Sequence, residues 1–373
     1  MDKKNIPYGR QWIDSKDIKE VEKVLRSDWL TQGPKVEEFE KSIAEYCGVK
    51  YAVAVSSGTA ALHSAYAVAG IKAGDEVITT PLTFAGTANM LVFCGAKPVF
   101  ADVENDTGNI DPNLIERLIT KKTKAIVPVD FAGHPCDYDK IFKIAKKHRL
   151  LVLEDAAHSL GSEHKGRKVG SFADMTILSF HPVKTITTGE GGMVLTNDEH
   201  FYKKLKVFRH HGMVKKPKMG GWYYQIERPS FNYRVTDIQC ALGISQMKKI
   251  NKFISRRRKI VARYNEEFKN IEGLTVPAEK NYAVSAWHIY PLRFEGYNRK
   301  KMFDNLRRHG IGVQVHYIPL NLQPFYKRNF NYKKGDFPRA EKYYSQAISL
   351  PLFPKMNEEE INRVVKVVKK YLS

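Results

Sequence analysis

The sequence predicts an α/β fold, with a large domain built on a mostly parallel sheet covered by helices and a smaller C-terminal α+β domain. Three observations predict this class. Short apolar runs alternate with helix-length spacers over residues 15–250, which is typical of a sheet covered on both faces. Gly, Pro and Asp bound those runs, as they do at strand ends. Beyond residue 250 this alternation gives way to a long basic helical stretch followed by shorter segments. A chain of 373 residues is long enough to bury two cores.

The elements of the first domain follow from the spacing of apolar residues. In SKDIKEVEKVL the apolar residues recur on one face, which predicts an amphipathic helix capped by Ser15. The segment KKPKMGGWYYQIERPS, at 215–230, is expected to be a mobile loop. Apolar runs predict the buried strands, which in chain order are YAVAVS (51–56), EVITT (76–80), KPVFADV (97–103), KAIVPVD (124–130), LLVLED (150–155) and MTIL (175–178).

The C-terminal part begins with a long basic helix, predicted to run from Asp237 to Phe268. We place the domain boundary near residue 250, so that residues 1–250, with the N-terminal segment, form the large domain and residues 251–373 the small one. The remaining runs assigned to this part are WHIYPLRF (287–294), a helix over 299–308, VQVHYIPL (313–320) and a final helix over 358–372.

Composition narrows the functional classes. The net charge of +21 and pI near 9.6 favour an anionic partner. The basic residues are dispersed and match no nucleic-acid recognition motif, so a small phosphorylated ligand is favoured over nucleic acid, with a solvated lysine-rich surface as the alternative. Four separated cysteines without a CxxC pair, no signal sequence and no long apolar run predict a reduced, cytoplasmic protein without a membrane span. No metal site is predicted.

One lysine stands in an unusual setting. Lys184 lies in SFHPVKTITTGEGG, directly after the predicted strand MTIL, among hydroxyls, glycines and a proline. A lysine at a strand end can pair with phosphate as a cation. With its pKa lowered by burial it can instead attack an aldehyde and form a Schiff base.

Three other strand ends carry residues that suit the second use. Ser57-Gly58-Thr59 precede an alanine-rich helix and could cradle an anion. Asp155 closes an apolar strand and needs a polar partner, and Phe84 could stack on a flat ligand. Taken singly, each has an ordinary alternative: a tight turn, a capping carboxylate or core packing.

Together these residues predict a pyridoxal 5′-phosphate (PLP) site. Ligands of parallel sheets bind at the carboxyl ends of strands, where these residues should meet. PLP linked to Lys184 would need a carboxylate at its ring nitrogen, an aromatic on its ring and a phosphate cradle. Asp155, Phe84, the segment 57–59 and Ser179 supply them.

Longer motifs carry a family resemblance over nearly the whole chain. The chain resembles the DegT/DnrJ/EryC1/StrS aminotransferases, PLP enzymes of fold type I that aminate nucleotide-linked keto sugars. The motifs that carry the resemblance are DWLTQGPKVEEFE, SSGTAAL, TTPLTFAGTANM, GAKPVFADV, GNIDPNLIERLITKKTKAIVPVDFAGHPCD, EDAAHSLGS, SFHPVKTITTGEGGMVLTND, FRHHGM and NYRVTDIQCALGISQMKK. SFHPVKTITTGEGG, LGISQMKK, VHYIPL and AEKYYSQAISLPL resemble the pseudaminic acid branch.

The resemblance implies roles for individual residues. Lys184 would carry PLP, Asp155 would pair with its ring nitrogen, and His158 would lie near its phenolic oxygen. Asn232 would reach the phosphate of the neighbouring subunit, which makes the protein a homodimer with shared active sites. The PLP contacts implied are Lys184, Asp155, His158, Phe84, Ser57, Gly58, Thr59, Ser179 and Asn232. The substrate contacts implied are Tyr8, Asp28, Trp29, Leu30, Thr31, Arg234, Gln314, Val315, His316 and Tyr317.

The activity implied is transfer of an amino group from L-glutamate to C4 of a UDP-linked 4-keto-6-deoxy-N-acetylhexosamine. Aminotransferases for other keto sugars, of the perosamine or bacillosamine type, are the alternatives inside the family. Outside it stand a PLP-binding protein without activity and a basic nucleic-acid-binding protein. A DNA-binding regulator would carry a helix-turn-helix domain, for which the two predicted domains leave no length. A related sugar dehydratase would replace the lysine with histidine, and Lys184 is present.

Overall fold

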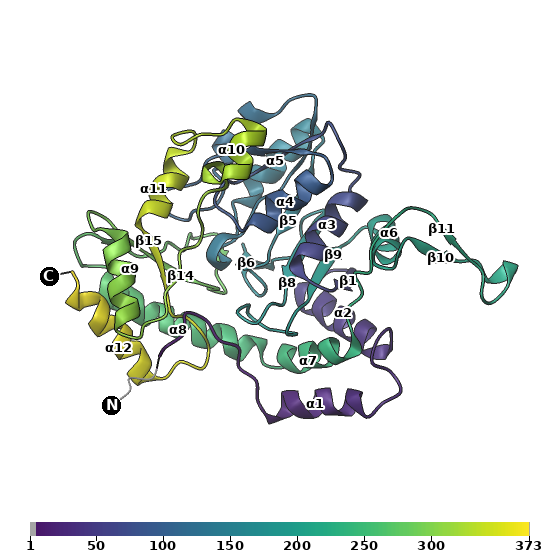
Figure 1. Ribbon diagram of the computed structural model, residues 1–373, viewed down its shortest axis with the longest axis horizontal. Coiled ribbons are helices and arrows are strands. Elements are labelled where there is room, and N and C mark those ends of the chain that lie inside the picture. The colour runs from purple at the N-terminus through teal and green to yellow at the C-terminus, as the bar shows by residue number, and fades with distance from the viewer. Residues whose placement is uncertain (1–4, 373) are drawn as a thin grey trace.

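The computed structural model describes residues 5–372 and is organised around a seven-stranded sheet (Figure 1). The strand order is β1-β9-β8-β5-β4-β2-β3. Strands pair in parallel from β8 to β3, while β9 runs antiparallel to both of its neighbours. The strands are β1 (Tyr51–Val55), β2 (Glu76–Thr79), β3 (Lys97–Phe100), β4 (Thr123–Ile126), β5 (Leu151–Asp155), β8 (Met175–Ser179) and β9 (Gly192–Thr196).

Helices cover both faces of this sheet because successive strand residues point to opposite sides. In β1, Val53 and Val55 belong to a core formed with α3 and α6, whereas Ala52 and Ala54 belong to another core with α2 and α7. The helices of the large domain are α1 (Ser15–Leu25), α2 (Pro34–Cys47), α3 (Gly58–Val68), α4 (Ala85–Phe93), α5 (Tyr138–His148), α6 (Glu199–Arg209) and α7 (Asp237–Met247).

A separate apolar core lies in the C-terminal part, around the three-stranded antiparallel sheet β12-β14-β15. Helix α8 joins the two parts, because Phe253 packs in the core of the large sheet while Tyr264 and Phe268 pack in the C-terminal core. The elements are α8 (Ile250–Phe268), β12 (Leu274–Thr275), β13 (Ala283–Val284), β14 (Tyr290–Phe294), α9 (Arg299–Arg308), α10 (Pro324–Phe330), α11 (Pro338–Gln346), β15 (Ala347–Leu350) and α12 (Glu358–Lys370).

Two predicted helix boundaries were wrong. Asp14, not Ser15, caps α1, because its side chain accepts hydrogen bonds from the backbone N–H groups of Lys16 and Asp17. The Asp17 side chain in turn accepts from the backbone N–H of Asp14, which completes a capping box. The predicted helix from Asp237 to Phe268 is two helices, with a break at 248–249. At the break Lys249 pairs with Asp14 and Asp17 of α1, and beyond it α8 turns toward the C-terminal core.

The segment expected to be a mobile loop folds as a hairpin. β10 (Met213–Lys215) pairs antiparallel with β11 (Tyr224–Ile226), and Figure 1 shows this hairpin projecting from the body of the protein. Its strands have only three residues each, too few for a clear alternation of apolar and polar residues, so they give little sequence signal. A third small sheet is formed by β13, β6 (Glu163–His164) and β7 (Arg167–Lys168).

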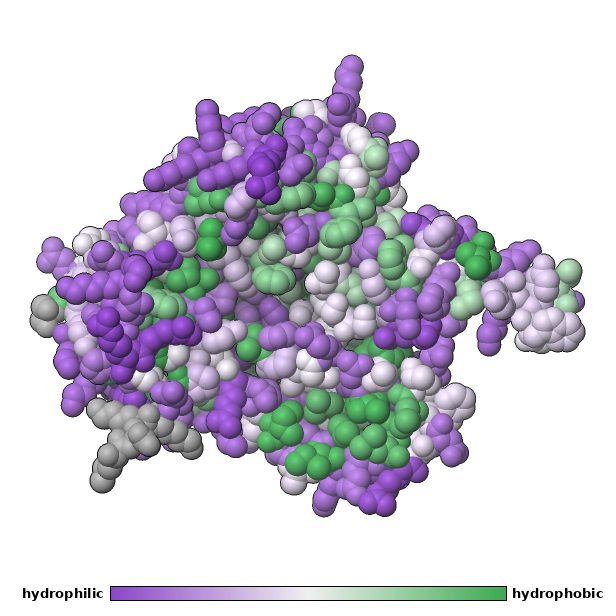
Figure 2. Space-filling view, in the orientation of Figure 1, coloured by the Kyte–Doolittle hydropathy of each residue, from purple (hydrophilic) through white to green (hydrophobic). Residues whose placement is uncertain are grey.

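The visible face of the molecule is mixed in polarity. Figure 2 shows polar side chains over most of it and an apolar area along the lower edge, where α1, α2 and α7 lie in Figure 1. Among residues 5–372 no helix has the length and apolar character needed to cross a membrane.

Candidate active site

The ends of four parallel strands converge on one cavity of about 350 Å³. β1 leads into the segment 57–59, β2 into Phe84, β5 ends at Asp155, and β8 leads into Lys184. The ends of these strands therefore bring together side chains that are more than a hundred residues apart in the sequence. The predicted residues that line the cavity are Tyr8, Ser57, Gly58, Thr59, Phe84, Asp155, His158, Ser179, Lys184, His316 and Tyr317.

Asp155 is a buried carboxylate that faces this cavity. Its Oδ2 accepts a hydrogen bond of 2.7 Å from the Thr87 hydroxyl, and its Oδ1 accepts one of 3.2 Å from the backbone N–H of Ala157. Burial raises the pKa of Asp155, while the two hydrogen bonds and the charge of Lys184 oppose that rise. A carboxylate of this kind is stabilised by any cationic N–H group that comes within hydrogen-bond distance of it.

Lys184 lines the same cavity, held by a turn in which its backbone N–H donates to the carbonyl of His181 over 2.9 Å. Burial lowers the pKa of Lys184 to about 8, and the charge of Asp155 partly opposes that shift. At pH 7 about a tenth of the amine is therefore uncharged, far more than for an exposed lysine, and the uncharged amine is the nucleophilic form.

The segment 57–59 and Ser179 form an anion cradle at the N-terminus of α3. Ser57 caps this helix through a 3.1 Å bond from the N–H of Ala60, so the N–H groups of the first turn point to the cavity end. Gly58 is required here, because a Cβ would lie 2.9 Å from the Cβ of Ser179. The missing side chain therefore lets the start of α3 and Ser179 lie side by side at the cavity.

Aromatic rings and imidazoles form the opposite wall. His158 is buried and its Nε2 lies 3.0 Å from the hydroxyl oxygen of Tyr317. Burial, followed by the charge of Lys184, keeps the pKa of His158 well below its usual value. Phe84 is 59% exposed, and its ring centroid is 6.0 Å from that of Tyr317. Phe84 therefore presents a free ring face, as a stacking residue would.

Several predicted residues lie away from the cavity of their own chain. Arg234 bonds the Nδ1 of His210 over 2.8 Å and lines a separate cavity. The backbone of Thr31 forms an isolated β-bridge with that of Thr236, and the backbone of Gln314 forms one with that of Ser349. The predicted residues outside the Lys184 cavity are Asp28, Trp29, Leu30, Thr31, Asn232, Arg234, Gln314 and Val315.

Ten residues of the cavity lining were not predicted, and two of them, Thr87 and His288, have side chains that contact predicted residues. Thr87 lies within the motif TTPLTFAGTANM, and its position one helical turn after Phe84 could have indicated that it faces the same way. His288 also lines the cavity. It follows Trp287 in a segment whose sequence, SAWHIY, is typical of a buried strand, so no signal marked its side chain as part of a site.

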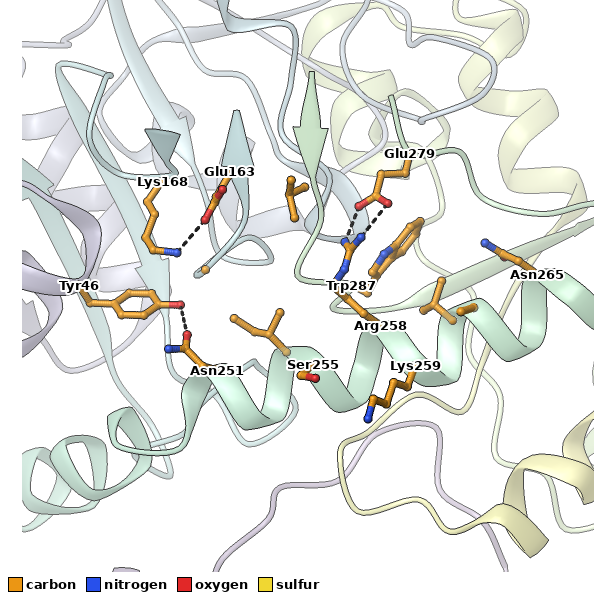
Figure 3. A pocket seen from close by; sticks show the side chains of 15 residues that line it. Tyr46, Glu163, Lys168, Asn251, Ser255, Arg258, Lys259, Asn265, Glu279 and Trp287 are labelled. Atoms are coloured by element: carbon orange, nitrogen blue, oxygen red, sulfur yellow. Dashed lines mark hydrogen bonds and ion pairs between the residues drawn. The ribbon is translucent and has the colours of Figure 1, made fainter. Parts of the chain in front are cut away.

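A larger groove of about 610 Å³ runs along α8, away from Lys184 (Figure 3). Its charged groups largely neutralise one another: Arg258 pairs with Glu279 at 2.6 Å and Lys168 with Glu163 at 3.0 Å. Trp287 lines this groove while the next residue, His288, lines the Lys184 cavity. The groove contains none of the predicted site residues.

Comparison with known proteins identifies the family of this chain. Residues 11–369 match the DegT/DnrJ/EryC1/StrS aminotransferase family. The chain belongs to that family, which confirms the predicted resemblance and the predicted enzyme class, a PLP-dependent sugar aminotransferase.

Three relatives illustrate the range of similarity. Protein MJ1066 of Methanocaldococcus jannaschii is 47% identical, covering 99% of this chain and 98% of the relative. Spore coat polysaccharide biosynthesis protein SpsC of Bacillus subtilis is 43% identical, covering 98% and 96%. A UDP-4-amino-4,6-dideoxy-N-acetyl-beta-L-altrosamine transaminase of Campylobacter jejuni is 43% identical, covering 94% and 93%.

Solved structures agree with the fold. Helicobacter pylori PseC, an aminotransferase involved in the biosynthesis of pseudoaminic acid, superposes with a TM-score of 0.94 at 38% identity, covering 99% of each chain. The PMP form of the sugar aminotransferase Spr1654 from Streptococcus pneumoniae gives a TM-score of 0.95 at 34% identity, again covering 99% of each. The predicted fold class, including PLP fold type I, is confirmed.

Proposed function

We propose that this protein uses PLP to transfer an amino group from L-glutamate to C4 of a UDP-linked 4-keto-6-deoxy-N-acetylhexosamine. The product would be UDP-4-amino-4,6-dideoxy-N-acetyl-β-L-altrosamine, a precursor of pseudaminic acid. The observation that carries the proposal is the meeting of an amine of lowered pKa, a buried carboxylate and an anion cradle in one cavity.

The residues present fit PLP on chemical grounds. The cradle at α3, with Gly58 held against Ser179, suits a phosphate. The buried carboxylate of Asp155 suits the protonated ring nitrogen, and the free face of Phe84 suits an aromatic ring. Lys184 is the primary amine within the same cavity. PLP, when bound, supplies an aldehyde for amines to condense with and a ring that accepts an electron pair.

Lys184 has two tasks in this proposal. Its Nζ would hold PLP in the resting enzyme. As a free amine, Nζ would be the base that takes a proton from the donor carbon and, in the second half-reaction, the acid that gives a proton to the acceptor carbon. A pKa of about 8 suits both directions of that transfer near neutral pH.

Hydrogen bonds hold Asp155, His158 and Tyr317 in fixed orientations around the cavity. Thr87 and the N–H of Ala157 hold the two oxygens of Asp155, so the carboxylate keeps one orientation. Tyr317 and His158 hold each other by a hydrogen bond. Burial keeps the pKa of His316 at about 4, so that His316 stays neutral beside Lys184.

We propose that the active form is a homodimer in which Asn232 of each subunit contacts the phosphate held by the other. Asn232 lies outside the Lys184 cavity of its own chain, which supports a role across an interface. Exposed apolar side chains on the N-terminal segment and on the β10–β11 hairpin support an interface as well: Trp29 is 55%, Trp222 83% and Ile226 64% exposed. Asp28 to Thr31 and Arg234 would then complete the substrate site.

The names of the Campylobacter and Helicobacter relatives support the UDP-sugar assignment. The equal identity to the Bacillus spore coat polysaccharide protein favours a second candidate, an aminotransferase for another nucleotide-linked keto sugar.

An assay with glutamate and a panel of UDP-, GDP- and dTDP-linked 4-keto sugars separates the two. We expect turnover with the UDP-linked 4-keto-6-deoxy-L-AltNAc substrate. Turnover with other keto sugars and none with this one would assign the enzyme to the second candidate.

The rate of PLP attachment in the apo protein should depend on pH in a way set by Lys184. The uncharged amine is the reactive form, so the rate rises with pH, with a midpoint near pH 8 rather than near the pKa of about 10.4 of an exposed lysine. Stopped-flow absorbance between pH 6 and 10 measures it. Asp155→Asn removes the charge that opposes the shift and should lower the midpoint. A midpoint at or above pH 10 would contradict the assignment.

A further inference from the structure

His288 lines the Lys184 cavity but has no role in the proposed mechanism. Its side chain is buried and lines the Lys184 cavity. Its ring centroid is 4.3 Å from that of His158, closer than the 6.1 Å between His158 and Tyr317. The residue that holds the 3.0 Å bond to Tyr317 is therefore packed directly against a second imidazole.

The two imidazoles share one feature, a buried ring nitrogen that is not hydrogen-bonded within the described part of the chain. The Nδ1 atoms of both His158 and His288 are buried without a hydrogen-bond partner among residues 5–372. A buried nitrogen without a partner costs folding free energy, and a phenylalanine would fill a similar volume without that cost. Other buried residues of the chain, such as His164, also have an unpartnered polar atom; His158 and His288 differ from His164 in that both line the Lys184 cavity.

The backbone around His288 is fixed from several sides. Its N–H donates to the carbonyl of Ala132 over 2.9 Å, and its carbonyl accepts from Arg257 over 3.0 Å. The same Arg257 nitrogen donates to the carbonyls of Trp287 and Leu352. Gly133 lets this segment pack closely, because a Cβ there would lie 3.0 Å from the backbone nitrogen of His288.

Burial is the main reason that both imidazoles stay neutral. It keeps the pKa of His288 well below its usual value, with smaller contributions from the neighbouring His158, Lys184 and Arg257. Arg257 is buried on α8 and forms no ion pair with a carboxylate in the described chain. His158 and His288 each have one N–H donor and one acceptor nitrogen in this neutral form.

We propose that His288 is a positioning residue for the aminotransferase reaction: it packs on His158 and sets the orientation in which His158 presents its Nε2 to Tyr317, and Arg257 holds the backbone of His288 in place. Tyr317 contacts Nε2, and His288 is the polar ring packed on His158. This inference rests on the proposed PLP chemistry but does not depend on which sugar is the acceptor.

The test compares His288→Phe with the wild-type enzyme in the glutamate half-reaction. We expect His288→Phe to unfold at the same or a higher temperature as apo protein, because it removes an unpartnered nitrogen. Its kcat should fall about tenfold with little change in the KM for glutamate. The pH midpoint of the visible band of bound PLP should move by about half a pH unit or more.

Two further variants separate function from packing. His288→Asn keeps polar atoms near the place of Nδ1 and should recover part of the lost kcat. His164→Phe is the matched control, because His164 is also buried with an unpartnered Nε2 but lies outside the cavity, and we expect wild-type kcat and midpoint from it. Wild-type kcat and an unmoved midpoint in both His288 variants would overturn the inference. Failure of the wild-type protein to bind PLP would instead refute the proposed function.

Discussion

Lys184→Ala is expected to lower transamination by at least about 10³-fold, because it removes both the covalent anchor and the proton-transfer base. The variant should also lack the visible band of covalently bound PLP. The measurement is single-turnover conversion of the PLP enzyme with glutamate, followed by absorbance.

The loss should not come from unfolding. The folded-state pKa of Lys184 lies near 8, below that of an unfolded lysine, so this residue costs stability below pH 8 and the cost fades as pH rises toward 10.5. The alanine variant should therefore keep most of its stability at pH 7. Lys168→Ala is the control, since Lys168 lies in the α8 groove and pairs with Glu163. A Lys184→Ala enzyme that still cycles would refute the role given to this lysine.

Asp155→Asn is expected to lower kcat roughly 10²–10³-fold, because an amide cannot stabilise the positive charge of a protonated ring nitrogen. The measurement is kcat with glutamate at saturating PLP. Burial raises the pKa of Asp155, so this carboxyl group costs folding stability as pH rises above its unfolded-state pKa, and the cost is complete once pH exceeds the folded-state pKa. The apo variant should accordingly be no less stable than wild type at pH 7.

Glu154→Gln is the matched control for that substitution. Glu154 precedes Asp155 on β5, is buried, and accepts from Thr176 over 2.6 Å, but it does not line the cavity. Burial and then the like charge of Asp130 keep its pKa well above the usual value, so glutamine resembles its protonated form. Equal losses from both variants would show that the effect is structural and not specific to the cavity.

Much of the fold was predictable from the sequence because its strands are short, apolar and buried. The runs at 51–56, 76–80, 150–155 and 175–178 each contain a strand of the central sheet. Burial on both faces makes such runs stand out. The hairpin at 213–226 gave no such signal because its strands face solvent, and β11 is exposed throughout.

The antiparallel direction of β9 was not predictable either, because local pattern does not encode which neighbour a strand meets. The break between α7 and α8 was not predicted either, and at it Lys249 pairs with Asp14 and Asp17, more than 200 residues earlier, which no local pattern indicates. Tertiary contacts decide both features.

The site was predictable where its residues follow strands, since parallel strands end at one edge. Lys184, Asp155, Gly58 and Phe84 were found in this way. Thr87 and His288 act through other residues, and a hydroxyl on a helix or a histidine in an apolar segment has many ordinary explanations. Only the three-dimensional contact with Asp155 or His158 marks them.

The central claim is that one amine, Lys184, holds the cofactor against the carboxylate of Asp155. Borohydride reduction of the PLP-loaded protein, followed by proteolysis and mass spectrometry of the peptides, tests this claim most directly. We predict a single pyridoxyl-modified peptide, carrying the label on Lys184 within SFHPVKTITTGEGG. A label on any other lysine, with Lys184 unmodified, would contradict the account.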